Sequence, residues 1–498
     1  MKFNFTHRLT AVSNEVWASL LLLLLLYIPI FGYLNQLPLR VYDEARLAVN
    51  AQEMIRYGNL LVTYFEGKPD MWNTKPPLMI WMQVLSIKCF GMSDFSIRFP
   101  SALAAFATCC SLLYFFWKYL NQFWLGWLTV FVLITSHGYI NIHGSRTGDY
   151  DALLTFFTTI SALLLFLDCR EAKSKYLYGF FISLTLGVLT KGITALLFGP
   201  AYLLLLLGFK KFRYTLARRE FYIGLVSFCA VVVAYYWGRE VINPGYLDAV
   251  WKNELGGRYT EVIEEHKADF WYYYQNFMKF QLSVWYLLIP CGLVLGLFSA
   301  NAVIRQVSAY FTALVVVFFF IISGAQTKLE WYDIPMYPWL AFFIAAPLWL
   351  VCKQLYALPV FKDNLYYNVS PVIFVIFVGI TPYQKIIQKT YKPQEYPWEK
   401  DYYEMSSYLQ KAVKGDFDVK NQFLLFDGYN ANNLFYMNIL NEKGANFKYK
   451  DWKQLSVGDT VLVYQGNIID YLREHYELTE TKAFWSVKTF AIDGIKPA

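Results

Sequence analysis

The sequence predicts a mainly α-helical protein that crosses a membrane many times and ends in a small α/β domain. Three observations predict this class. Of the 498 residues, 57% are hydrophobic and only 16% are charged, whereas soluble domains carry about a quarter charged residues. Apolar runs long enough for transmembrane helices recur up to Tyr383. After Tyr383 the composition becomes that of a soluble domain.

The basic residues predict the orientation in the membrane. Lys and Arg concentrate in short loops, above all "KKFRYTLARR" (Lys210 to Arg219) and "DCREAKSK" (Asp168 to Lys175), and such loops face the cytoplasm. We therefore expect a multi-pass membrane protein with a cytoplasmic N-terminus and an outer face that is the periplasm or its equivalent. The net charge of +7 is not concentrated in one basic stretch, so no nucleic-acid partner is expected.

One short apolar segment, "PPLMIWMQVLSIKCFG" (Pro76 to Gly91), decides how many times the chain crosses. It opens with two prolines and contains Lys88. If it lies at the outer interface, both basic loops face the cytoplasm; if it crosses, every later loop is reversed. The interfacial placement gives about eleven spans, or up to thirteen if long segments are split, and an odd number puts the C-terminus in the periplasm. The spans are expected at about residues 16–33, 97–117, 123–139, 152–167, 176–189, 193–209, 221–237, 284–298, 309–323, 334–351 and 368–382.

The change of composition divides the chain into two domains. Residues 1–382 form the transmembrane domain, with outer juxtamembrane loops at residues 34–96 and 239–279. Residues 383–498 form a periplasmic α/β domain, in which "NQFLLFDGYN", "DTVLVYQGN" and "AFWSVKTFAI" are typical of strands and "YEMSSYLQKAV" and "IIDYLREHYEL" of amphipathic helices. The seven cysteines form no CxxC pair, so a structural zinc site is not expected.

This orientation gathers acidic and basic side chains from four distant loops on the outer face. Ionisable groups at membrane depth are costly and usually functional. Together they suit a phosphate leaving group, because cations neutralise its charge and a carboxylate can take a proton from an attacking hydroxyl. Taken singly, each also has a simpler explanation as a helix start, a helix cap or an interfacial anchor. The set comprises Asp43, Glu44, Arg46, Glu66, Lys68, Asp70, Lys75, His143, Arg146, Asp149, Asp151, Glu254, Arg258, Glu264, Glu265, His266, Lys328, Glu330, Tyr332 and Asp333.

Seven motifs follow one another in a consistent order: "DEAR", "NTKPPLMIWMQ", "FSIRFPSALAA", "RTGDYDALLTFF", "TKG", "EEHKADFWYYY" and "TKLEWYDIPMYPWLA". Each is weak alone, but the series, which covers Asp43 to about Leu340, resembles the membrane glycosyltransferases that use polyprenyl-phosphate sugars. It is most similar to the bacterial aminoarabinose (lipid A) transferases and less so to protein O-mannosyltransferases and oligosaccharyltransferases. The resemblance implies the GT-C glycosyltransferase fold, with a cavity that opens outward.

The resemblance also implies roles at matching positions. Asp43 matches the essential acid of the first outer loop. Asp151 matches the acid of the second outer loop, with Asp149 as the competing assignment, and Glu44 completes the candidate catalytic carboxylates. The candidate ligands of the lipid phosphate and the sugar are Arg46, Lys75, Arg146, Arg258, His266, Lys328 and Tyr332.

One position departs from the family pattern. The family has a glutamate just before the lysine of its "KPP" segment, and here Thr74 stands in that place. A metal bridge from this position to His266 is therefore not expected to be inherited, and the presence of a divalent metal stays open.

We therefore expect an enzyme that transfers a sugar, with inversion, from an undecaprenyl-phosphate donor to lipid A or another glycan or glycolipid acceptor at the periplasmic face. Asp43 would be the base toward a hydroxyl acceptor, or a positioning group if the acceptor is an ionised phosphate. The alternatives are a transporter or flippase of lipid-linked sugars, a polymerase or ligase that uses a diphosphate-linked donor, and a protein O-glycosyltransferase. The chain shows no internal repeat of the kind common in transporters.

Overall fold

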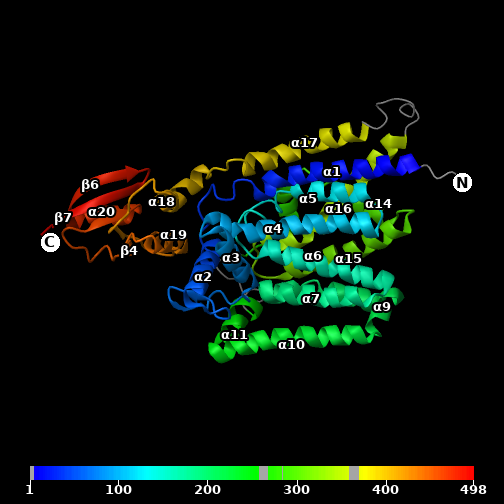
Figure 1. Ribbon diagram of the computed structural model, residues 1–498, viewed down its shortest axis with the longest axis horizontal. Helices are drawn as coiled ribbons and strands as arrows, with labels where there is room; N and C mark the ends of the chain where they lie inside the picture. Colours follow the sequence, from blue (N-terminus) through cyan, green and yellow to red (C-terminus); the bar gives the residue numbers. More distant parts are fainter. Residues whose placement is uncertain (1–4, 257–266, 283, 358–369, 498) are drawn as a thin grey trace.

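The computed structural model describes residues 5–256, 267–282, 284–357 and 370–497, and it is mainly helical with one small sheet near the C-terminus (Figure 1). Within these residues, eight helices are long and apolar enough to cross a membrane, and the chain is a multi-pass membrane protein. These helices are α1 (Phe5–Phe31), α4 (Asp94–Tyr114), α6 (Asp151–Glu171), α7 (Ser174–Lys191), α10 (Arg219–Ile242), α15 (Ala302–Gly324), α16 (Tyr337–Ala357) and α17 (Ser370–Thr390).

Four further apolar helices are shorter. They are α3 (Leu78–Phe90), α5 (Phe123–Ile134), α8 (Gly199–Gly208) and α14 (Leu288–Leu297). At a rise of about 1.5 Å per residue each is at most about 20 Å long, less than the roughly 30 Å of a bilayer core. Three of them, α5, α8 and α14, lie within expected spans. The turn of 3₁₀-helix η2 (Gly192–Leu196) separates α7 from α8 and explains why the latter is short.

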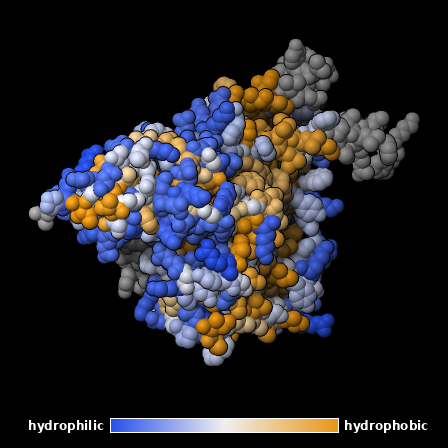
Figure 2. All heavy atoms as spheres, turned by 60° about the vertical axis from the view of Figure 1, so that its left-hand side comes forward, coloured by the Kyte–Doolittle hydropathy of each residue, from blue (hydrophilic) through white to orange (hydrophobic). Residues whose placement is uncertain are grey.

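The segment Pro76 to Gly91 forms α3, which lies beside α2 (Asp43–Tyr57) at one end of the helix bundle (Figure 1). This end, called the site end below, also carries the small hairpin of β1 (Tyr64–Phe65) and β2 (Lys68–Pro69). Hydrophilic side chains cover this part of the molecule and apolar ones cover the bundle (Figure 2). The segment is thus a short helix at this end of the bundle, and its place at the membrane interface stays a prediction.

The C-terminal part is a mixed α/β unit. Its five-stranded sheet has the order β4-β3-β5-β7-β6, in which β3 is parallel to β4 and β5, while β7 is antiparallel to β5 and β6. The first two expected strands and both expected helices are present, although the first strand is only two residues long and the second helix ends at His475. The third expected strand, residues 483–492, is instead a hairpin with a turn at residues 485–486. The elements are α18 (Pro397–Lys414), β3 (Phe423–Leu424), α19 (Ala431–Glu442), β4 (Lys448–Tyr449), β5 (Thr460–Val463), α20 (Gly466–His475), β6 (Tyr476–Phe484) and β7 (Val487–Ile495).

Polar contacts fix this unit to the site end. The Tyr436 hydroxyl accepts a hydrogen bond from the backbone N–H of Leu39 at 2.8 Å and donates one to Asp94. The Arg40 guanidinium forms an ion pair with Glu395 at 2.6 Å. Because both sets of contacts flank the start of α2, the C-terminal unit sits against the helix that carries Asp43.

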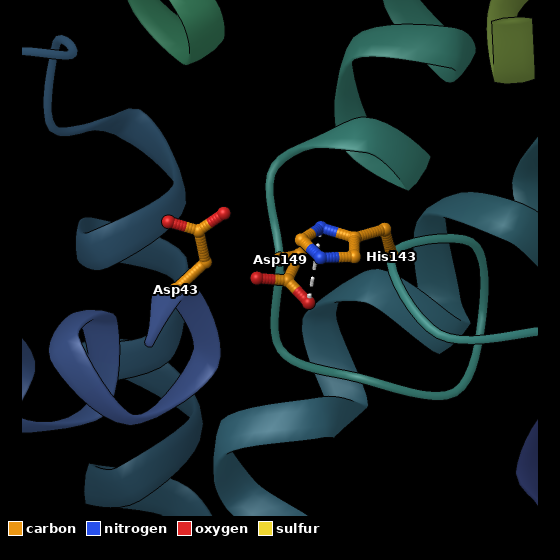
Figure 3. A group of neighbouring side chains, drawn as sticks. All are labelled: Asp43, His143 and Asp149. Carbon is orange, nitrogen blue, oxygen red and sulfur yellow. Dashed lines mark ion pairs between the residues drawn. The ribbon is translucent and has the colours of Figure 1, made fainter. Parts of the chain in front are cut away.

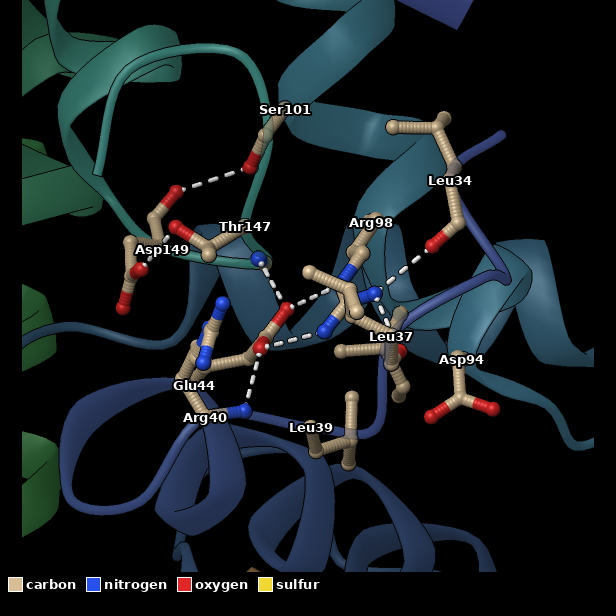
Figure 4. A network of polar contacts seen from close by, with 12 residues as sticks. Leu34, Leu37, Leu39, Arg40, Glu44, Asp94, Arg98, Ser101, Thr147 and Asp149 are labelled. Carbon is tan, nitrogen blue, oxygen red and sulfur yellow. Dashed lines mark hydrogen bonds and ion pairs between the residues drawn. The ribbon is translucent and has the colours of Figure 1, made fainter. Parts of the chain in front are cut away.

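A buried ion pair joins α2 to α4 (Figure 4). Arg98 Nε lies 2.7 Å from Glu44 Oε1, and Arg98 also donates to the backbone carbonyls of Leu34, Leu37 and Pro38. Glu44 is 1% exposed and Arg98 is 3% exposed. The Glu44 carboxylate accepts two more hydrogen bonds, from the backbone N–H groups of Arg40 and Gly148.

Every strong donor around Glu44 favours its charged form. Burial alone would raise the pKa of this carboxyl, but the charge and hydrogen bonds of Arg98, with the two backbone donors, lower it. A buried charge is tolerated when it is paired and fully hydrogen-bonded. The pair therefore fixes the first turn of α2 relative to α4 and to the loop at residue 148.

Replacing Arg98 by Met should be strongly destabilising, because it leaves the Glu44 carboxylate buried without its counter-ion. We expect the free energy of unfolding to fall by about 3 to 5 kcal/mol, measured as thermal unfolding of the purified protein in detergent. Arg56→Met is the matched control, since Arg56 faces Glu442 across 4.0 Å with both side chains about half exposed, and it should cost less than about 1 kcal/mol. Equal effects of the two substitutions would contradict this role.

Candidate active site

A cavity of about 240 Å³ opens at the site end, and five sequence-distant segments line it. Its charged lining comprises Asp43, Lys75, His143, Asp149, Asp151, Lys191 and Glu254. Three aromatic side chains, Tyr150, Trp331 and Tyr332, complete the polar side. Ile193, Leu197, Ile321 and Ile322 form an apolar side. This arrangement, with apolar walls and a few convergent charges, is typical of a ligand site.

Asp43 is the first residue of α2, and its side chain is exposed toward the cavity. The preceding residue, Tyr42, has a left-handed backbone with φ of 69°, a conformation that non-glycine residues rarely adopt. A carboxylate at a helix N-terminus is favoured by the helix dipole. Asp43 lies across from His143 and Asp149, as Figure 3 shows.

The loop between α5 and α6 supplies His143 and Asp149. His143 Nδ1 lies 3.5 Å from Asp149 Oδ2, and its ring stacks on Trp331 with centroids 3.6 Å apart. The Thr147 hydroxyl donates to Asp149 Oδ2 and accepts from the backbone N–H of His143 at 2.7 Å. Packing and hydrogen bonds thus hold both side chains in one orientation.

The electrostatics of this pair depend on the neighbouring acids. Burial, with the charges of Asp43 and Glu44, raises the pKa of Asp149 to about 7, although His143 opposes the shift. Burial would lower the pKa of His143, but the nearby carboxylates outweigh it and raise that pKa. Near neutral pH this pair can therefore both give and take protons.

One group within the described residues could hold a metal ion. Asp43, His143 and Asp149 each offer one ligand atom, and these atoms lie within 4.8 Å of one another. The donor set fits a divalent transition metal, for which one imidazole and two carboxylates are ordinary ligands. In addition, Asp149 Oδ1 is buried without a hydrogen-bond partner among the described residues, so the site offers an unused acceptor where an ion would lie.

Asp151 is engaged by a lysine that the sequence reasoning did not select. Lys191 Nζ lies 2.5 Å from Asp151 Oδ1, and both side chains are buried. His143 Nδ1 is 3.7 Å from the other Asp151 oxygen, and Lys191 lies over the Tyr332 ring at 5.5 Å. The signal was present in the sequence, because Lys191 belongs to the "TKG" motif at the end of an apolar run, where a charge is unusual.

Lys75 has an acidic partner from a distant loop. Lys75 Nζ forms an ion pair with Glu254 Oε1 at 3.2 Å, and both side chains are only slightly exposed. The hydroxyl of Thr74, the residue that departs from the family pattern, donates to the same oxygen at 3.4 Å. Glu254 therefore compensates the charge that a phosphate would otherwise neutralise.

Arg46 shapes the segment that carries Lys75. It donates to both oxygens of Asp70, at 2.7 and 2.8 Å, and its guanidinium stacks on Phe65 at 4.3 Å. Asp70 Oδ1 also accepts from the backbone N–H groups of Trp72 and Asn73. The resulting turn places the chain at residue 75 beside the cavity.

The structure divides the expected site residues into two sets and leaves two outside. Those that line the cavity are Asp43, Asp149, Asp151, Lys75 and Tyr332. Those that do not are Glu44, Arg46, Arg146 and Lys328. Arg146 donates to backbone carbonyls at the end of α1, and Lys328 to those of Ala268 and Ala325. Arg258 and His266 lie outside the described residues.

The residues that do not line the cavity bind the backbone or other side chains around it instead. Glu44 was expected among the catalytic carboxylates, but its oxygens accept hydrogen bonds from Arg98 and from two backbone N–H groups. It therefore fixes the position of the neighbouring residue Asp43 and does not itself line the cavity. The sequence placed His143 and Glu254 in the outer-face set but did not assign them to the site, and it did not single out Trp331. All three line the cavity.

Replacing Asp70 by Asn should weaken the fold in a pH-dependent way. Burial would raise the pKa of Asp70, but Arg46 and the surrounding donors lower it, so this carboxylate stabilises the fold above its ordinary pKa near 4 and loses that effect as the pH falls further. At pH 7 we expect Asp70→Asn to cost about 3 kcal/mol, and the difference from wild type should shrink below about pH 4 in thermal unfolding. Asp470→Asn, in an exposed pair, is the control; a loss independent of pH would contradict the role of the charge.

Comparisons with known proteins agree with this geometry. Residues 74–237 match the family model described as dolichyl-phosphate-mannose-protein mannosyltransferase. The undecaprenyl phosphate-alpha-4-amino-4-deoxy-L-arabinose arabinosyl transferase of Aeromonas salmonicida is 27% identical over 344 residues, which cover 66% of this chain and 59% of the relative. The corresponding enzyme of Edwardsiella ictaluri is 28% identical over 66% of this chain and 58% of its own length. The matched region thus spans less than two thirds of these relatives.

Solved structures extend the likeness over almost the whole chain. The crystal structure of ArnT from Cupriavidus metallidurans bound to undecaprenyl phosphate is similar with a TM-score of 0.68 and 14% identity, covering 96% of this chain and 98% of that one. An Archaeoglobus fulgidus oligosaccharyltransferase in complex with Zn and sulfate is similar with a TM-score of 0.54 and 10% identity, covering 89% and 63%. The resemblance drawn from the motifs is thereby confirmed, and the chain has the GT-C fold of the membrane glycosyltransferases.

Proposed function

We propose that this protein is a glycosyltransferase that moves a sugar from an undecaprenyl-phosphate donor to lipid A or another glycan or glycolipid acceptor. The single observation that carries the proposal is the cavity that brings Asp43, Asp149, Asp151, Lys75 and Tyr332 together beside an apolar wall. The names of the relatives, which are transferases of an undecaprenyl-phosphate-linked sugar, support the donor class. So does the ArnT structure bound to undecaprenyl phosphate.

The cavity suits the donor lipid by its charge and its apolar wall. Lys75 can pair with the donor phosphate once Glu254 releases it, and Tyr332 lines the same cavity. The isoleucine and leucine side chains opposite offer a path for the polyprenyl chain. Positive charge near the phosphate stabilises the negative charge that accumulates as it leaves.

The reaction is a single displacement at the anomeric carbon. An acceptor oxygen forms a bond to this carbon from the face opposite the leaving lipid phosphate, the bond between the carbon and the phosphate oxygen breaks, and the configuration inverts. Asp43 is the preferred base toward a hydroxyl acceptor, because it lines the cavity and is exposed within it. Asp151 is less suited, since Lys191 pairs with it. If the acceptor is an ionised phosphate, Asp43 positions it instead.

A divalent ion, if bound, would be held by Asp43, His143 and Asp149 and would add positive charge beside the leaving phosphate. Without a metal ion, the paired side chains of His143 and Asp149 still lie across the cavity from Asp43, where they can hydrogen-bond a reactant. The chain's own residues thus bind, orient and neutralise the reactants in either case.

We further propose that the site end faces the periplasm and that the N-terminus is cytoplasmic. The basic segment α9 (Lys210–Leu216) lies at the opposite end of the bundle from α2 and α3 (Figure 1), and basic loops favour the cytoplasm. The division at residue 382/383 between a transmembrane and a periplasmic domain belongs to the same proposal. In the structure α17 continues to Thr390 and α18 begins at Pro397.

The test is to incubate the purified protein in lipid with undecaprenyl-phosphate sugars and glycolipid acceptors and to measure released undecaprenyl phosphate by mass spectrometry. Asp43→Asn should lower the rate by at least about 100-fold, the usual contribution of a general base, while leaving thermal unfolding unchanged. The control is Asp248→Asn, since Asp248 is 65% exposed in a pair with Lys252.

Each outcome has a defined meaning. Acceptor-dependent release that requires Asp43 supports the proposal. Retained turnover by Asp43→Asn would remove its assigned role. If a broad donor panel gives no release, but the protein moves labelled lipid between leaflets of vesicles, the transporter alternative replaces the glycosyltransferase.

A further inference from the structure

A second cavity of about 180 Å³ lies at the site end and shares no lining residue with the active site. It lies between the end of α5, the π-helical turn η4 (Phe277–Gln281) with the segment that follows it, and the end of α17. We call it the cationic cavity and define it by Thr135, His137, Gln281, Trp285, Lys385 and Lys389. The proposed sugar transfer does not use it.

The positive charge of this cavity has no acidic counterpart in the described chain. Lys385 and Lys389 are four residues apart on α17, a spacing at which like charges repel. Neither forms an ion pair with a carboxylate among the described residues. Lys389 Nζ instead lies 2.6 Å from His137 Nε2, and burial, with the charge of Lys389, lowers the pKa of His137 to about 4. The imidazole is therefore a neutral acceptor that holds the ammonium at the cavity.

A buried amide adds a second, independent observation. Gln281 is 5% exposed and lines the cavity, and its Oε1 atom has no hydrogen-bond partner in the described structure. Buried polar groups in folded proteins nearly always have a partner. A bound molecule with a hydroxyl group or, with the amide turned over, an anionic oxygen would supply one.

The remaining walls match a lipid rather than a soluble anion. Phe280, Val284, Trp285, Pro382 and Ile386 surround the lysines with apolar surface. The side chain of Phe280 is 63% exposed. The rest of the protein also leaves most of α17 uncovered, since only 17% of the residues in its apolar stretch are buried. The cavity therefore opens beside lipid at the end of the helices, where head groups lie.

We propose that the cationic cavity binds the phosphate head group of an anionic membrane lipid, through Lys385 and Lys389, at a site separate from that of the sugar donor. His137 keeps Lys389 in place, and Gln281 hydrogen-bonds the head group. The apolar walls contact the start of the acyl chains. Because His137 belongs to the loop that carries His143 and Asp149, the lipid would be bound beside the active-site loop without entering the active site.

The test is native mass spectrometry of the full-length protein released from nanodiscs that contain equal amounts of phosphatidylglycerol and phosphatidylcholine. Wild type should retain one phosphatidylglycerol. Each lysine near an anionic lipid contributes about fivefold in affinity, so Lys385→Gln/Lys389→Gln should lower retention roughly 25-fold. Lys385→Arg/Lys389→Arg should preserve it, and Lys353→Gln, an exposed lysine at the end of α16, should not change it.

Other results would overturn the proposal. Unchanged retention in the double Gln variant would exclude the two lysines, provided that it elutes as one species and unfolds at the wild-type temperature. Equal retention of phosphatidylcholine would exclude recognition of an anionic head group. Full displacement by millimolar inorganic phosphate would identify a site for soluble anions. Because the readout is retained lipid, none of these results depends on sugar transfer.

Discussion

The buried ion pair between Glu44 and Arg98 is the contact on which the geometry of the active site depends. Glu44 is adjacent in sequence to Asp43, and Gly148, whose N–H it accepts, is adjacent to Asp149. One carboxylate therefore sets the distance between two acids that come from loops about a hundred residues apart. Burying this pair costs desolvation energy, which the geometry and the extra hydrogen bonds offset. We interpret its main role as fixing one arrangement of α2, α4 and the loop before α6, rather than adding net stability.

Both lysines that line the cavity are also paired with carboxylates. Lys191 is neutralised by Asp151 and Lys75 by Glu254, so the site can exist in a low-dielectric setting before any substrate enters. Under the proposed function, a phosphate that approaches Lys75 must compete with Glu254 for the lysine, and this competition would favour a strong anion. Asp43 is exposed in the cavity at the N-terminus of α2, and under the proposed function it is the group that acts on a reactant.

The fold class and most of the spans could be predicted, because hydrophobic length is a local property of the sequence. Asp43 and Lys75 could be predicted too, since each lies in a motif of its own. Which charged side chains pair with one another could not be predicted from the sequence. The Glu44 side chain could point into the cavity or toward Arg98, and the packing of α2 against α4 decides between the two. In the same way, Lys191 reaches Asp151 only because α6 and α7 lie side by side, and no periodicity in either segment records that contact.

The central claim is that the phosphate of the sugar donor binds in the active-site cavity beside Lys75, and locating that phosphate tests it most directly. A cryo-electron microscopy structure of the protein with undecaprenyl phosphate would give its position relative to both cavities. The account predicts phosphate density in the active-site cavity, within about 4 Å of Lys75 Nζ, with Glu254 displaced from the lysine and Asp43 still opposite Asp149. An active-site cavity without phosphate density at a saturating concentration of the lipid, with the Lys75–Glu254 pair intact, would contradict it.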